Sequence, residues 1–344
     1  MDKKLRVAVI GCGRISPMHL DAIKTSEYAS LVACCDIKKE RAIEAATQYG
    51  AEAYTSYEKM LKEVMPDVVH LCLPHYLHSE YAIKAFELGI NVLTEKPMDV
   101  DYASAEKAVN VAKEKNLMYG VIFQCRYNAS AQAVKHAIES GRLGKIISAR
   151  SILTWARPDE YYSQSDWKGT WDKEGGGVVI DQAIHSIDLT NWCINSKVKR
   201  VECSMCNRRH DSGKEVEDTA EGLITYENGV SYAFYCMNNY GCSEPIEIKL
   251  FCEKGKVTFG YDDAVIEYDD GSVERAHTTE ECTATVDGKP KYWCNCHSRQ
   301  IEQFYRACLK LEPLEISGEQ ALNTHKLITD IYNVGGLRPR VKRT

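Results

Sequence analysis

The sequence lacks the features that would place it in several special classes of protein. No stretch approaches ~18 consecutive apolar residues, the length that a membrane-spanning helix needs. The net charge is −6 with acidic and basic residues interspersed, so no basic stripe is present and nucleic acid is not an expected partner. Internal repeats and low-complexity tracts are also missing. What remains has an ordinary globular composition, with 44% hydrophobic and 27% charged residues.

The N-terminal residues do not resemble a secretory signal. The apolar run after the first basic residues covers about four or five residues, and no small-residue cleavage site follows it. We therefore expect a cytoplasmic protein whose 15 cysteines are reduced. Two clusters raise the alternative of a zinc site: Cys203 with Cys206, and Cys294 with Cys296 and His297. Zinc sites usually separate their cysteines by about two to four residues. In the second cluster one residue separates Cys294 from Cys296, so buried free thiols are favoured and no metal is expected.

The length of 344 residues predicts two domains. In the first part, segments typical of strands alternate with segments typical of helices. The expected strands cover 5–11, 31–36, 67–74, 91–97 and 118–123, and the expected helices cover 14–26, 38–50, 78–89 and 102–115. This alternation predicts an α/β domain over residues 1–123, a Rossmann fold with a doubly wound parallel sheet.

The pattern changes after about residue 124. A helix at 129–140 leads into longer segments with period-two hydrophobicity, which are joined by turn signals such as Glu-Asn-Gly and Asp-Asp-Gly. Two more helices are expected at 297–310 and 318–333. Residues 124–344 are therefore predicted to form an α+β domain for substrate binding and oligomerisation, with a large open, mostly antiparallel sheet and helices on one face.

The loop after the first strand has most of a dinucleotide-binding fingerprint. Gly11 makes the tight turn, and Gly13 lets a pyrophosphate approach the backbone. The third position needs only a small residue, which Ser16 is. The N-terminus of the following helix then faces the pyrophosphate. Arg14 and Ile15 complete the loop and are expected to contact the cofactor.

Asp36 supports this interpretation, because it ends the second strand 20 residues beyond Ser16. A carboxylate at that place accepts hydrogen bonds from the ribose hydroxyls of the adenosine. It would repel a 2′-phosphate, so NAD is favoured over NADP. Lys38, Lys39 and Arg41 keep NADP open as the alternative.

Three segments together resemble motifs of the Gfo/Idh/MocA family, which includes glucose–fructose oxidoreductase and inositol dehydrogenase. They are Glu95-Lys96-Pro97 after the fourth strand, LCLPHYLH at 71–78 with Pro74 and His78, and GGGVVIDQAIHSIDL at 175–189 with Asp181 and His185. The resemblance extends over essentially the whole chain, through Tyr332.

The resemblance implies hydride transfer between a nicotinamide and a sugar, inositol or related polyol. It implies that Pro74, His78, Glu95 and Lys96 contact the cofactor. It also implies a homodimer or homotetramer, because the open sheet of the second domain often mediates assembly in this family.

The chemistry of these residues supports a catalytic role for three of them. Oxidation of a secondary alcohol needs a base for the hydroxyl proton and a cation near the developing alkoxide. His185 is the candidate base, because an unperturbed histidine has a pKa near ~6.5. It lies four residues after Asp181, so one helix face carries both. Lys96, at the carboxyl end of a strand, would polarise the hydroxyl while Asp181 orients substrate. A structural His–Asp pair and a solvated lysine are the alternatives.

The substrate clues lie mainly in WARPDEYYSQSDWKGTWDKEGGG at 155–177. Its aromatic faces would stack on the C–H face of a pyranose, with Arg157, Tyr161 or Tyr162 binding hydroxyls and Trp167 nearby. The alternative is an ordered loop that packs its aromatic side chains against the domain. Similar proteins place the residues at Arg126, Tyr127 and His297 near substrate, although an interdomain salt bridge and a helix-start histidine are almost equally good interpretations.

The sequence favours an NAD-dependent oxidoreductase acting on a secondary hydroxyl of a sugar or glycoside, with C3 of a pyranose as the candidate position. Inositol dehydrogenation remains an alternative. A glycoside hydrolase that oxidises its substrate transiently with bound NAD is another, and it would need a second base such as a tyrosine. A non-catalytic nucleotide-sensing regulator is the third alternative, against which the joint presence of Lys96, Asp181 and His185 argues.

Overall fold

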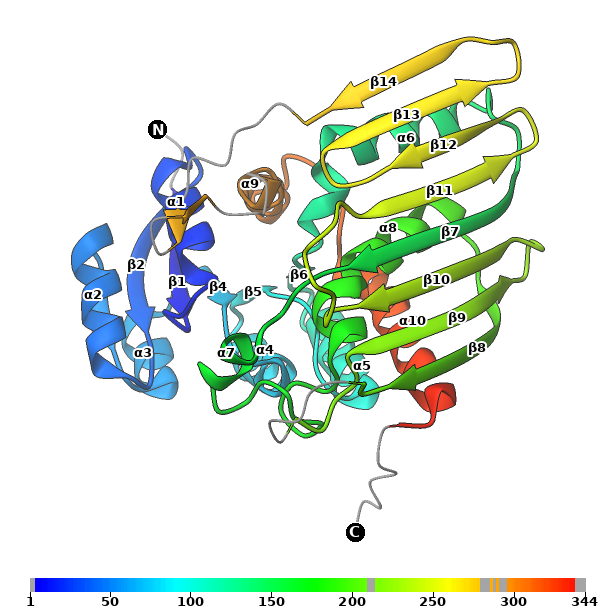
Figure 1. Ribbon diagram of the computed structural model, residues 1–344. Helices are drawn as coiled ribbons and strands as arrows, with labels where there is room; N and C mark the ends of the chain where they lie inside the picture. Colours follow the sequence, from blue (N-terminus) through cyan, green and yellow to red (C-terminus); the bar gives the residue numbers. More distant parts are fainter. Residues whose placement is uncertain (1–3, 209–213, 279–284, 287–288, 291–295, 338–344) are drawn as a thin grey trace. The chain divides into compact units, whose positions relative to one another are not determined.

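The computed structural model describes residues 4–208, 214–278, 285–286, 289–290 and 296–337 (Figure 1). Contacts between Cα atoms divide the chain into two compact units. Unit 1 comprises Met1–Gln124 and Glu280–Leu322, and unit 2 comprises Cys125–Thr279 and Asn323–Thr344. The chain first passes from unit 1 to unit 2 after Gln124, next to the domain boundary expected after residue 123. The return of residues 280–322 to unit 1 differs from the expectation that all of 124–344 form one domain.

Unit 1 contains the predicted doubly wound parallel sheet. Among the described residues it has six strands in the order β3-β2-β1-β4-β5-β6. They are β1 (Leu5–Ile10), β2 (Ala29–Cys35), β3 (Glu52–Tyr54), β4 (Val68–Leu71), β5 (Asn91–Thr94) and β6 (Tyr119–Val121). The order reverses between β1 and β4, which is the Rossmann topology and confirms the fold class. Strand β3 was not predicted.

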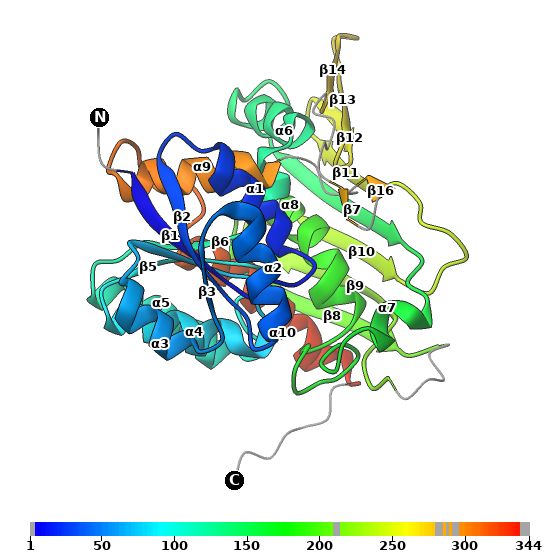
Figure 2. The same ribbon diagram turned by 90° about the vertical axis from the view of Figure 1, so that its left-hand side faces the viewer.

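Helices cover both faces of this sheet. Helices α1 (Ser16–Thr25), α2 (Lys39–Tyr49) and α9 (Cys296–Cys308) pack on one side. Helices α3 (Tyr57–Val64), α4 (His78–Glu87) and α5 (Tyr102–Glu114) lie on the other (Figure 2). Ile301, Phe304 and Tyr305 of α9 are fully or almost fully buried in one cluster with Val7 and Val9 of β1. This apolar stripe explains why residues after 280 return to unit 1.

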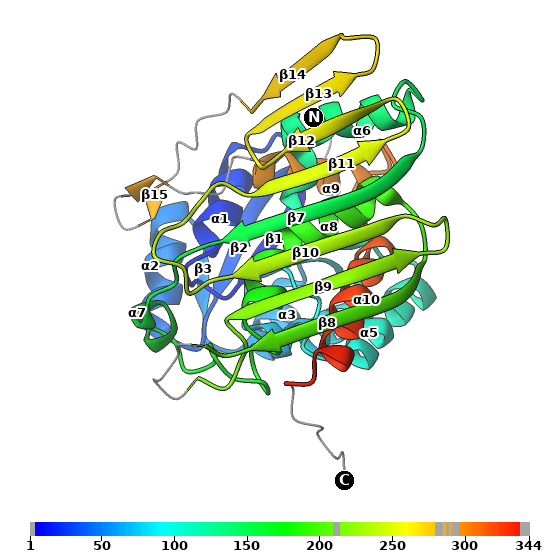
Figure 3. The same ribbon diagram turned by 45° about the vertical axis from the view of Figure 1, so that its right-hand side comes forward.

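Unit 2 contains a large open sheet. Among the described residues it has eight strands in the order β14-β13-β12-β11-β7-β10-β9-β8 (Figure 3). They are β7 (Ile146–Thr154), β8 (Val198–Cys206), β9 (Thr219–Tyr226), β10 (Ser231–Met237), β11 (Glu247–Cys252), β12 (Gly255–Phe259), β13 (Asp263–Tyr268) and β14 (Val273–His277). Strands β7 and β10 pair in parallel and the other pairs are antiparallel, which confirms the predicted sheet type.

One face of the unit 2 sheet carries the helices. Figure 3 shows α6 (Ala129–Glu139), α8 (Ile184–Ile194) and α10 (Gly318–Gly335) behind the strands, with α10 entering unit 2 at Asn323. The opposite face presents exposed apolar side chains, including Ile152, Leu223 and Phe251. The remaining elements are short: η1 (His75–Leu77), η2 (Gln124–Tyr127), α7 (Asp159–Ser163), the π-turn η3 (Val179–Ala183), β15 (Thr285–Val286) and β16 (Lys289–Pro290). No helix within the described ranges has both the length and the apolar character needed to cross a membrane.

Candidate functional site

The glycine loop of unit 1 has the shape that a dinucleotide requires. Gly11 follows β1 with φ +88°, and a Cβ there would lie 2.3 Å from the carbonyl oxygen of Cys72. Apart from its chain neighbours, no atom of the described residues lies within 4 Å of the Cβ position at Gly13, so the backbone there borders open space. Ser16 opens α1 and donates its hydroxyl to the Gly13 carbonyl at 2.8 Å. The loop is closed at Gly11 and open at Gly13, which fits the approach of a pyrophosphate.

Asp36 is tied to the same loop. Its Oδ2 accepts a hydrogen bond from the Cys12 amide at 2.8 Å, and its Oδ1 accepts one from the Lys38 amide at 2.8 Å. A carboxylate accepts about four hydrogen bonds, so each oxygen retains capacity for a ribose hydroxyl. The residues present therefore fit the adenosine half of NAD.

His78 braces two turns at the carboxyl edge of the sheet. Its side chain is fully buried, with Nε2 2.8 Å from the Leu73 carbonyl and Nδ1 2.6 Å from the Pro97 carbonyl. The turn after β4 is thereby joined to the turn after β5. The predicted contribution of His78 to cofactor binding would act through the shape of the turn at Leu73 and Pro74.

A hydrogen-bonded network of buried polar side chains begins at Glu95, the residue before Lys96. Glu95 Oε1 lies 3.0 Å from His19 Nε2 and 3.3 Å from His297 Nε2. His19 Nδ1 lies 2.9 Å from His70 Nδ1, and His70 Nε2 lies 2.9 Å from the hydroxyl of Tyr305. Because a carboxylate only accepts, His19 donates from Nε2 to Glu95. With a neutral His19 ring, His70 donates from Nδ1 to His19 and Tyr305 donates to His70.

This hydrogen-bonded network keeps the side chain of Glu95 ionised, as a carboxylate that accepts hydrogen bonds. Burial alone would raise the pKa of Glu95, but hydrogen bonds from His19 and His297 bring it well below its usual range. Burial lowers the pKa of both His70 and His297, so these rings are neutral donors. Glu95 Oε2 in turn accepts the Lys96 amide at 3.2 Å. The network therefore fixes the backbone that carries Lys96, and it occupies the Nε2 of His297, which was predicted to approach substrate.

Asp181 and His185 are the least buried residues of one helical segment in unit 2. Asp181 falls in the π-turn η3 and His185 in the first turn of α8. From Gly177 to Thr190, these two residues are half-buried and all the others are buried. That is the arrangement given by two residues four apart on one helix face. A π-turn is frequent at functional sites.

Three donors converge on one oxygen of Asp181. Oδ2 accepts from the hydroxyl of Tyr161 at 2.6 Å, from Lys168 Nζ at 3.1 Å and from Gln182 Nε2 at 2.5 Å. The side chain of Asp181 is 9% exposed and that of Lys168 is 15% exposed. Asp181 is thus held as a carboxylate in a fixed orientation.

The aromatic stretch is packed around this carboxylate. The predicted substrate residue Tyr162 is buried, and its hydroxyl accepts from Asn238 at 2.7 Å. The same amide group donates to Gln182, the neighbour of Asp181, at 2.9 Å. The Arg157 guanidinium lies over the rings of Trp155 and Tyr161, with ring-centroid distances of 4.7 and 5.3 Å. The ring of the predicted residue Trp167 lies 4.8 Å from Lys168 Nζ. The structure therefore brings Arg157, Tyr162 and Trp167 together with Asp181.

Glu217 fixes the start of the segment that carries Asp181. Its carboxylate accepts from the amides of Gly177 at 2.9 Å and Val179 at 3.0 Å, and from the Tyr332 hydroxyl at 2.7 Å. A Cβ on Gly177 would lie 1.9 Å from the Glu217 carbonyl oxygen, and one on Gly176 would lie 2.0 Å from the Tyr332 hydroxyl. This close approach explains the last two glycines of the Gly-Gly-Gly run.

Glu217 is expected to make stability fall as the pH rises. Burial raises its pKa from 4.5 to about 7, so the folded protein binds this proton more tightly than the unfolded chain does. The stabilisation is complete below pH ~4.5 and is lost by pH ~7, a change of about 3 kcal/mol. The advantage of the wild type over Glu217→Gln in urea unfolding should therefore shrink from pH 5 to pH 8. Glu221→Gln, on half-buried Glu221 of β9, is the control. Equal advantages at both pH values would contradict the expectation.

Arg126 has a partner within its own unit. Its Nε lies 2.7 Å from Asp188 Oδ2 and its Nη2 lies 2.6 Å from Asp188 Oδ1. The side chains are 9% and 2% exposed, and Thr324 also donates to Asp188 Oδ1 at 2.6 Å. The guanidinium was predicted to reach substrate or an interdomain salt bridge. The ion pair lies inside unit 2 and anchors η2 to α8. The neighbouring Tyr127 is half-buried.

The cysteine clusters do not converge on a metal where they are described. Cys203 and Cys206 both lie on β8, three residues apart, so their side chains point to opposite faces of the sheet. Cys294 lies outside the described residues. Across the ranges that the structure describes, no group of three or more His, Cys, Asp or Glu side chains is arranged to hold a metal ion.

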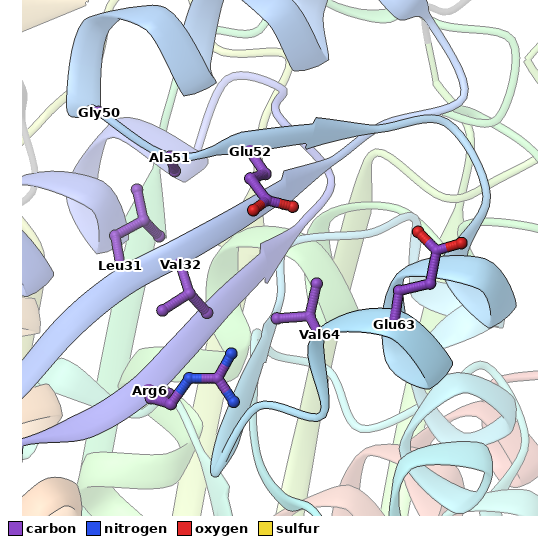
Figure 4. Close-up of a pocket in the computed structure, with 8 residues that line it drawn as sticks. All are labelled: Arg6, Leu31, Val32, Gly50, Ala51, Glu52, Glu63 and Val64. Carbon is purple, nitrogen blue, oxygen red and sulfur yellow. The ribbon is translucent and has the colours of Figure 1, made fainter.

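A cavity of about 310 Å³ in unit 1 lies away from the predicted cofactor edge (Figure 4). Its lining residues are Arg6, Leu31, Val32, Gly50, Ala51, Glu52, Glu63 and Val64. These belong to β1, β2, the turn between α2 and β3, the start of β3 and the end of α3. Ligands of open parallel sheets bind at the carboxyl ends of the strands, so this cavity is not the candidate site.

Several residues of the site were missed in the sequence. Lys168 and Glu174 are charged residues inside an aromatic stretch, and Glu217 precedes a strand without any motif. His70 interrupts the apolar strand β4, which is a usable signal because a buried histidine needs hydrogen-bonding partners. His19 carries no comparable signal on α1.

The comparisons with known proteins agree with this geometry. Residues 5–123 match the family model described as "Oxidoreductase family, NAD-binding Rossmann fold", and residues 131–258 match the GFO/IDH/MocA C-terminal domain. D-glucoside 3-dehydrogenase of Escherichia coli is 29% identical over 65% of this chain and 68% of that protein. Myo-inositol 2-dehydrogenase of Thermotoga maritima is 25% identical over 74% of each chain. The WlbA dehydrogenase of Bordetella pertussis, solved with NADH and UDP-GlcNAcA, is 28% identical over 97% of both chains, with a TM-score of 0.83.

Unit 1 thus has the fold of an NAD-binding oxidoreductase, and both family models follow one another along the chain in the expected order. The chain belongs to the Gfo/Idh/MocA family of oxidoreductases.

Proposed function

We propose that this protein transfers hydride between a secondary hydroxyl of a sugar or glycoside and NAD, with C3 of a pyranose as the candidate position. The observation that carries the proposal is the pair of Asp181 and His185 on the least buried side of one helical segment, present in one chain with Lys96 at the carboxyl end of an NAD-binding sheet. The relatives named above support it, because they include a glucoside 3-dehydrogenase and an inositol 2-dehydrogenase. Inositol oxidation is therefore the nearest alternative.

In this proposal NAD, when bound, accepts or returns the hydride. Gly11, Gly13, Arg14 and Ile15 would hold its pyrophosphate, and Asp36 its adenosine ribose, which favours NAD over NADP. The carboxyl edge at Pro74, His78, Glu95 and Lys96 would hold its nicotinamide half.

The remaining residues would handle the substrate and its proton. His185 takes the hydroxyl proton, Lys96 stabilises the developing negative charge on the oxygen, and Asp181 orients the hydroxyl. Arg157, Tyr162 and Trp167 would line the sugar, with Tyr127 and His297 as further candidates. Unit 2 would be the substrate domain. Arg126 would contribute to it indirectly, because its ion pair with Asp188 anchors η2 to α8.

We also propose that two or four copies assemble through the unit 2 sheet, in the cytoplasm. Ile152, Leu223 and Phe251 are 36–41% exposed on the sheet face opposite the helices. An apolar sheet face of this kind favours burial against a second copy.

The hydrolase alternative needs a second base, and the tyrosines near Asp181 are poorly suited to that role. Burial raises the pKa of Tyr161, and the nearby Asp181 charge raises it further. Burial also raises the pKa of Tyr162. Both hydroxyls are therefore held protonated at neutral pH.

The proposal predicts net NADH formation in a screen of NAD+ with monosaccharides, glycosides, nucleotide sugars and inositols. Aglycone release without NADH formation would contradict the dehydrogenase and support the hydrolase. Binding of NADH without turnover of any compound in either direction would replace it with the nucleotide-sensing regulator. The His185→Asn variant serves as the blank, because it removes the proposed base and leaves the glycine loop unchanged.

A further inference from the structure

A second lysine is built into unit 2 beside the proposed catalytic carboxylate. Lys168 Nζ lies 2.8 Å from the hydroxyl of Tyr161, 3.1 Å from Asp181 Oδ2 and 3.4 Å from Glu174 Oε1. Glu174 is fully buried, and the Lys168 side chain is 15% exposed. An ammonium group has three N–H donors, and here each has an acceptor.

We propose that Lys168 is a positioning residue for the hydride transfer, which holds Asp181 charged and in one orientation so that Asp181 can orient the reacting hydroxyl. This assignment rests on the proposed function above. It gives Lys168 a role through Asp181 and no contact with substrate.

The charge of Lys168 is what distinguishes it among the donors to Asp181. Tyr161 and Gln182 donate as neutral groups, and of these three donors Lys168 alone carries a positive charge. A carboxylate that is 9% exposed is costly to keep ionised unless it is paired. Burial alone would lower the pKa of Lys168, but Asp181, Tyr161 and Glu174 together outweigh burial and hold this pKa well above its usual value, with Asp181 as the largest of the three contributions.

The loop is shaped to hold the ammonium group in place. Two aromatic faces enclose it, because Nζ lies 4.4 Å from the Tyr161 ring centroid and 4.8 Å from that of Trp167. Glu174 Oε2 accepts the amide of the next residue, Gly169, at 2.5 Å. Lys168 is thus fixed by its own backbone as well as by its charge partners.

Glu174 makes this arrangement sensitive to pH. It faces Lys168, Asp181 and Tyr162, and burial raises its pKa to about 8. Near neutral pH its carboxyl is protonated, so the cluster holds one cation and one anion. Above pH ~8 a second carboxylate competes with Asp181 for Lys168. Glu174→Gln should therefore remove a decline in kcat above that pH.

The kinetic test compares Lys168→Met with Lys173→Met, a lysine of the same loop that donates to the Asp166 carbonyl at 3.4 Å. We expect Lys168→Met to lower kcat roughly 10–100-fold, as loss of a partner that orients a reactive ligand does, with KM changed much less. The lower acid limb of the kcat/KM profile, which reports Asp181 below the limb set by the proposed base His185, should move up by roughly one pH unit or more, because protonation of Asp181 no longer breaks an ion pair. Lys168→Arg should restore the limb, and Lys173→Met should leave it in place.

A second readout needs no turnover. The carboxyl 13C resonance of Asp181, assigned with Asp181→Asn, reports the pH midpoint of its protonation, which should rise in Lys168→Met and stay constant in Lys173→Met. A rise in a protein that oxidises no compound in the screen would support Lys168 while the proposed function fails. An unchanged midpoint and pH profile in an active enzyme would overturn the role of Lys168 alone. If Lys168→Met does not fold, Lys168→Gln, which keeps a polar donor, is measured against Lys168→Arg with the same criteria.

Discussion

Lys96→Met is expected to lower kcat by roughly 10³-fold and to leave most of the NADH affinity intact. Removal of a single group that stabilises a developing oxyanion costs about this much in enzymes that depend on it. Lys96 follows β5 and is half-buried, at the edge where parallel sheets bind ligands. Steady-state kinetics with the substrate found in the screen, together with an NADH fluorescence titration, separates the two effects.

The control is Lys113→Met on α5. Lys113 is 74% exposed and pairs with Glu319 at 3.1 Å. The Lys113→Met variant removes one positive charge from unit 1, as Lys96→Met does, but at a place where solvent screens that charge. Its kcat should therefore stay within about two-fold of the wild type. Lys96→Arg should recover little, because a planar guanidinium does not replace a compact ammonium group.

The double variant Lys96→Met/His185→Asn tests whether the two residues serve one chemical step. Residues that act as a unit give strongly non-additive losses. The double variant should therefore lose about as much activity as the worse single variant. A Lys96→Met enzyme that keeps more than a tenth of the wild-type kcat with normal NADH affinity would remove Lys96 from the mechanism.

The Rossmann topology could be predicted because its strands are short buried runs that end near glycines or charged residues. Strand β3 was missed because it has three residues, of which Glu52 and Ala53 are exposed, so it carries no apolar signal. Helix α3 could have been found. Ser56 caps it by accepting the Lys59 amide, and Tyr57, Met60, Leu61 and Val64 are buried at helical spacing.

The place of α9 could not be predicted in the same way. Its apolar stripe shows that the helix packs on something, and both units contain a sheet face able to receive it. The burial of Phe304 and Tyr305 with β1 decides the question, together with the bond between Tyr305 and His70. These contacts join residues more than 200 positions apart.

The residues of the candidate site also divide into those with a local sequence pattern and those that depend on long-range contacts. Gly11, Gly13, Asp36, Lys96, Asp181 and His185 sit in local patterns, so the sequence alone is enough to propose them as candidates. Lys168, Glu174 and Glu217 act on the site through tertiary contacts that depend on the path of a loop. The same limit applies to Arg126, whose sequence position suggested substrate while its hydrogen bonds lead to Asp188.

Asp188→Ala is expected to lower the free energy of unfolding by about 3–5 kcal/mol, because it leaves the guanidinium of Arg126 buried without its anion. It also removes the acceptor of Thr324. Urea unfolding followed by circular dichroism measures the loss. Lys256→Ala is the matched control, because Lys256 pairs with Glu267 across β12 and β13 with side chains 56% and 41% exposed. Its loss should stay below about 1 kcal/mol.

The paired variant Arg126→Met/Asp188→Leu decides why the single variant is unstable. If the loss comes from an uncompensated buried charge, replacement of both partners by apolar side chains of similar volume should recover most of it. Activity measured on the refolded double variant then isolates the remaining role of Arg126. If the guanidinium binds substrate, Arg126→Met raises KM while Asp188→Ala changes the unfolding free energy by less than about 1 kcal/mol. A bidentate pair whose side chains are 9% and 2% exposed leads us to expect the opposite pattern, a large loss of stability that the double variant repairs.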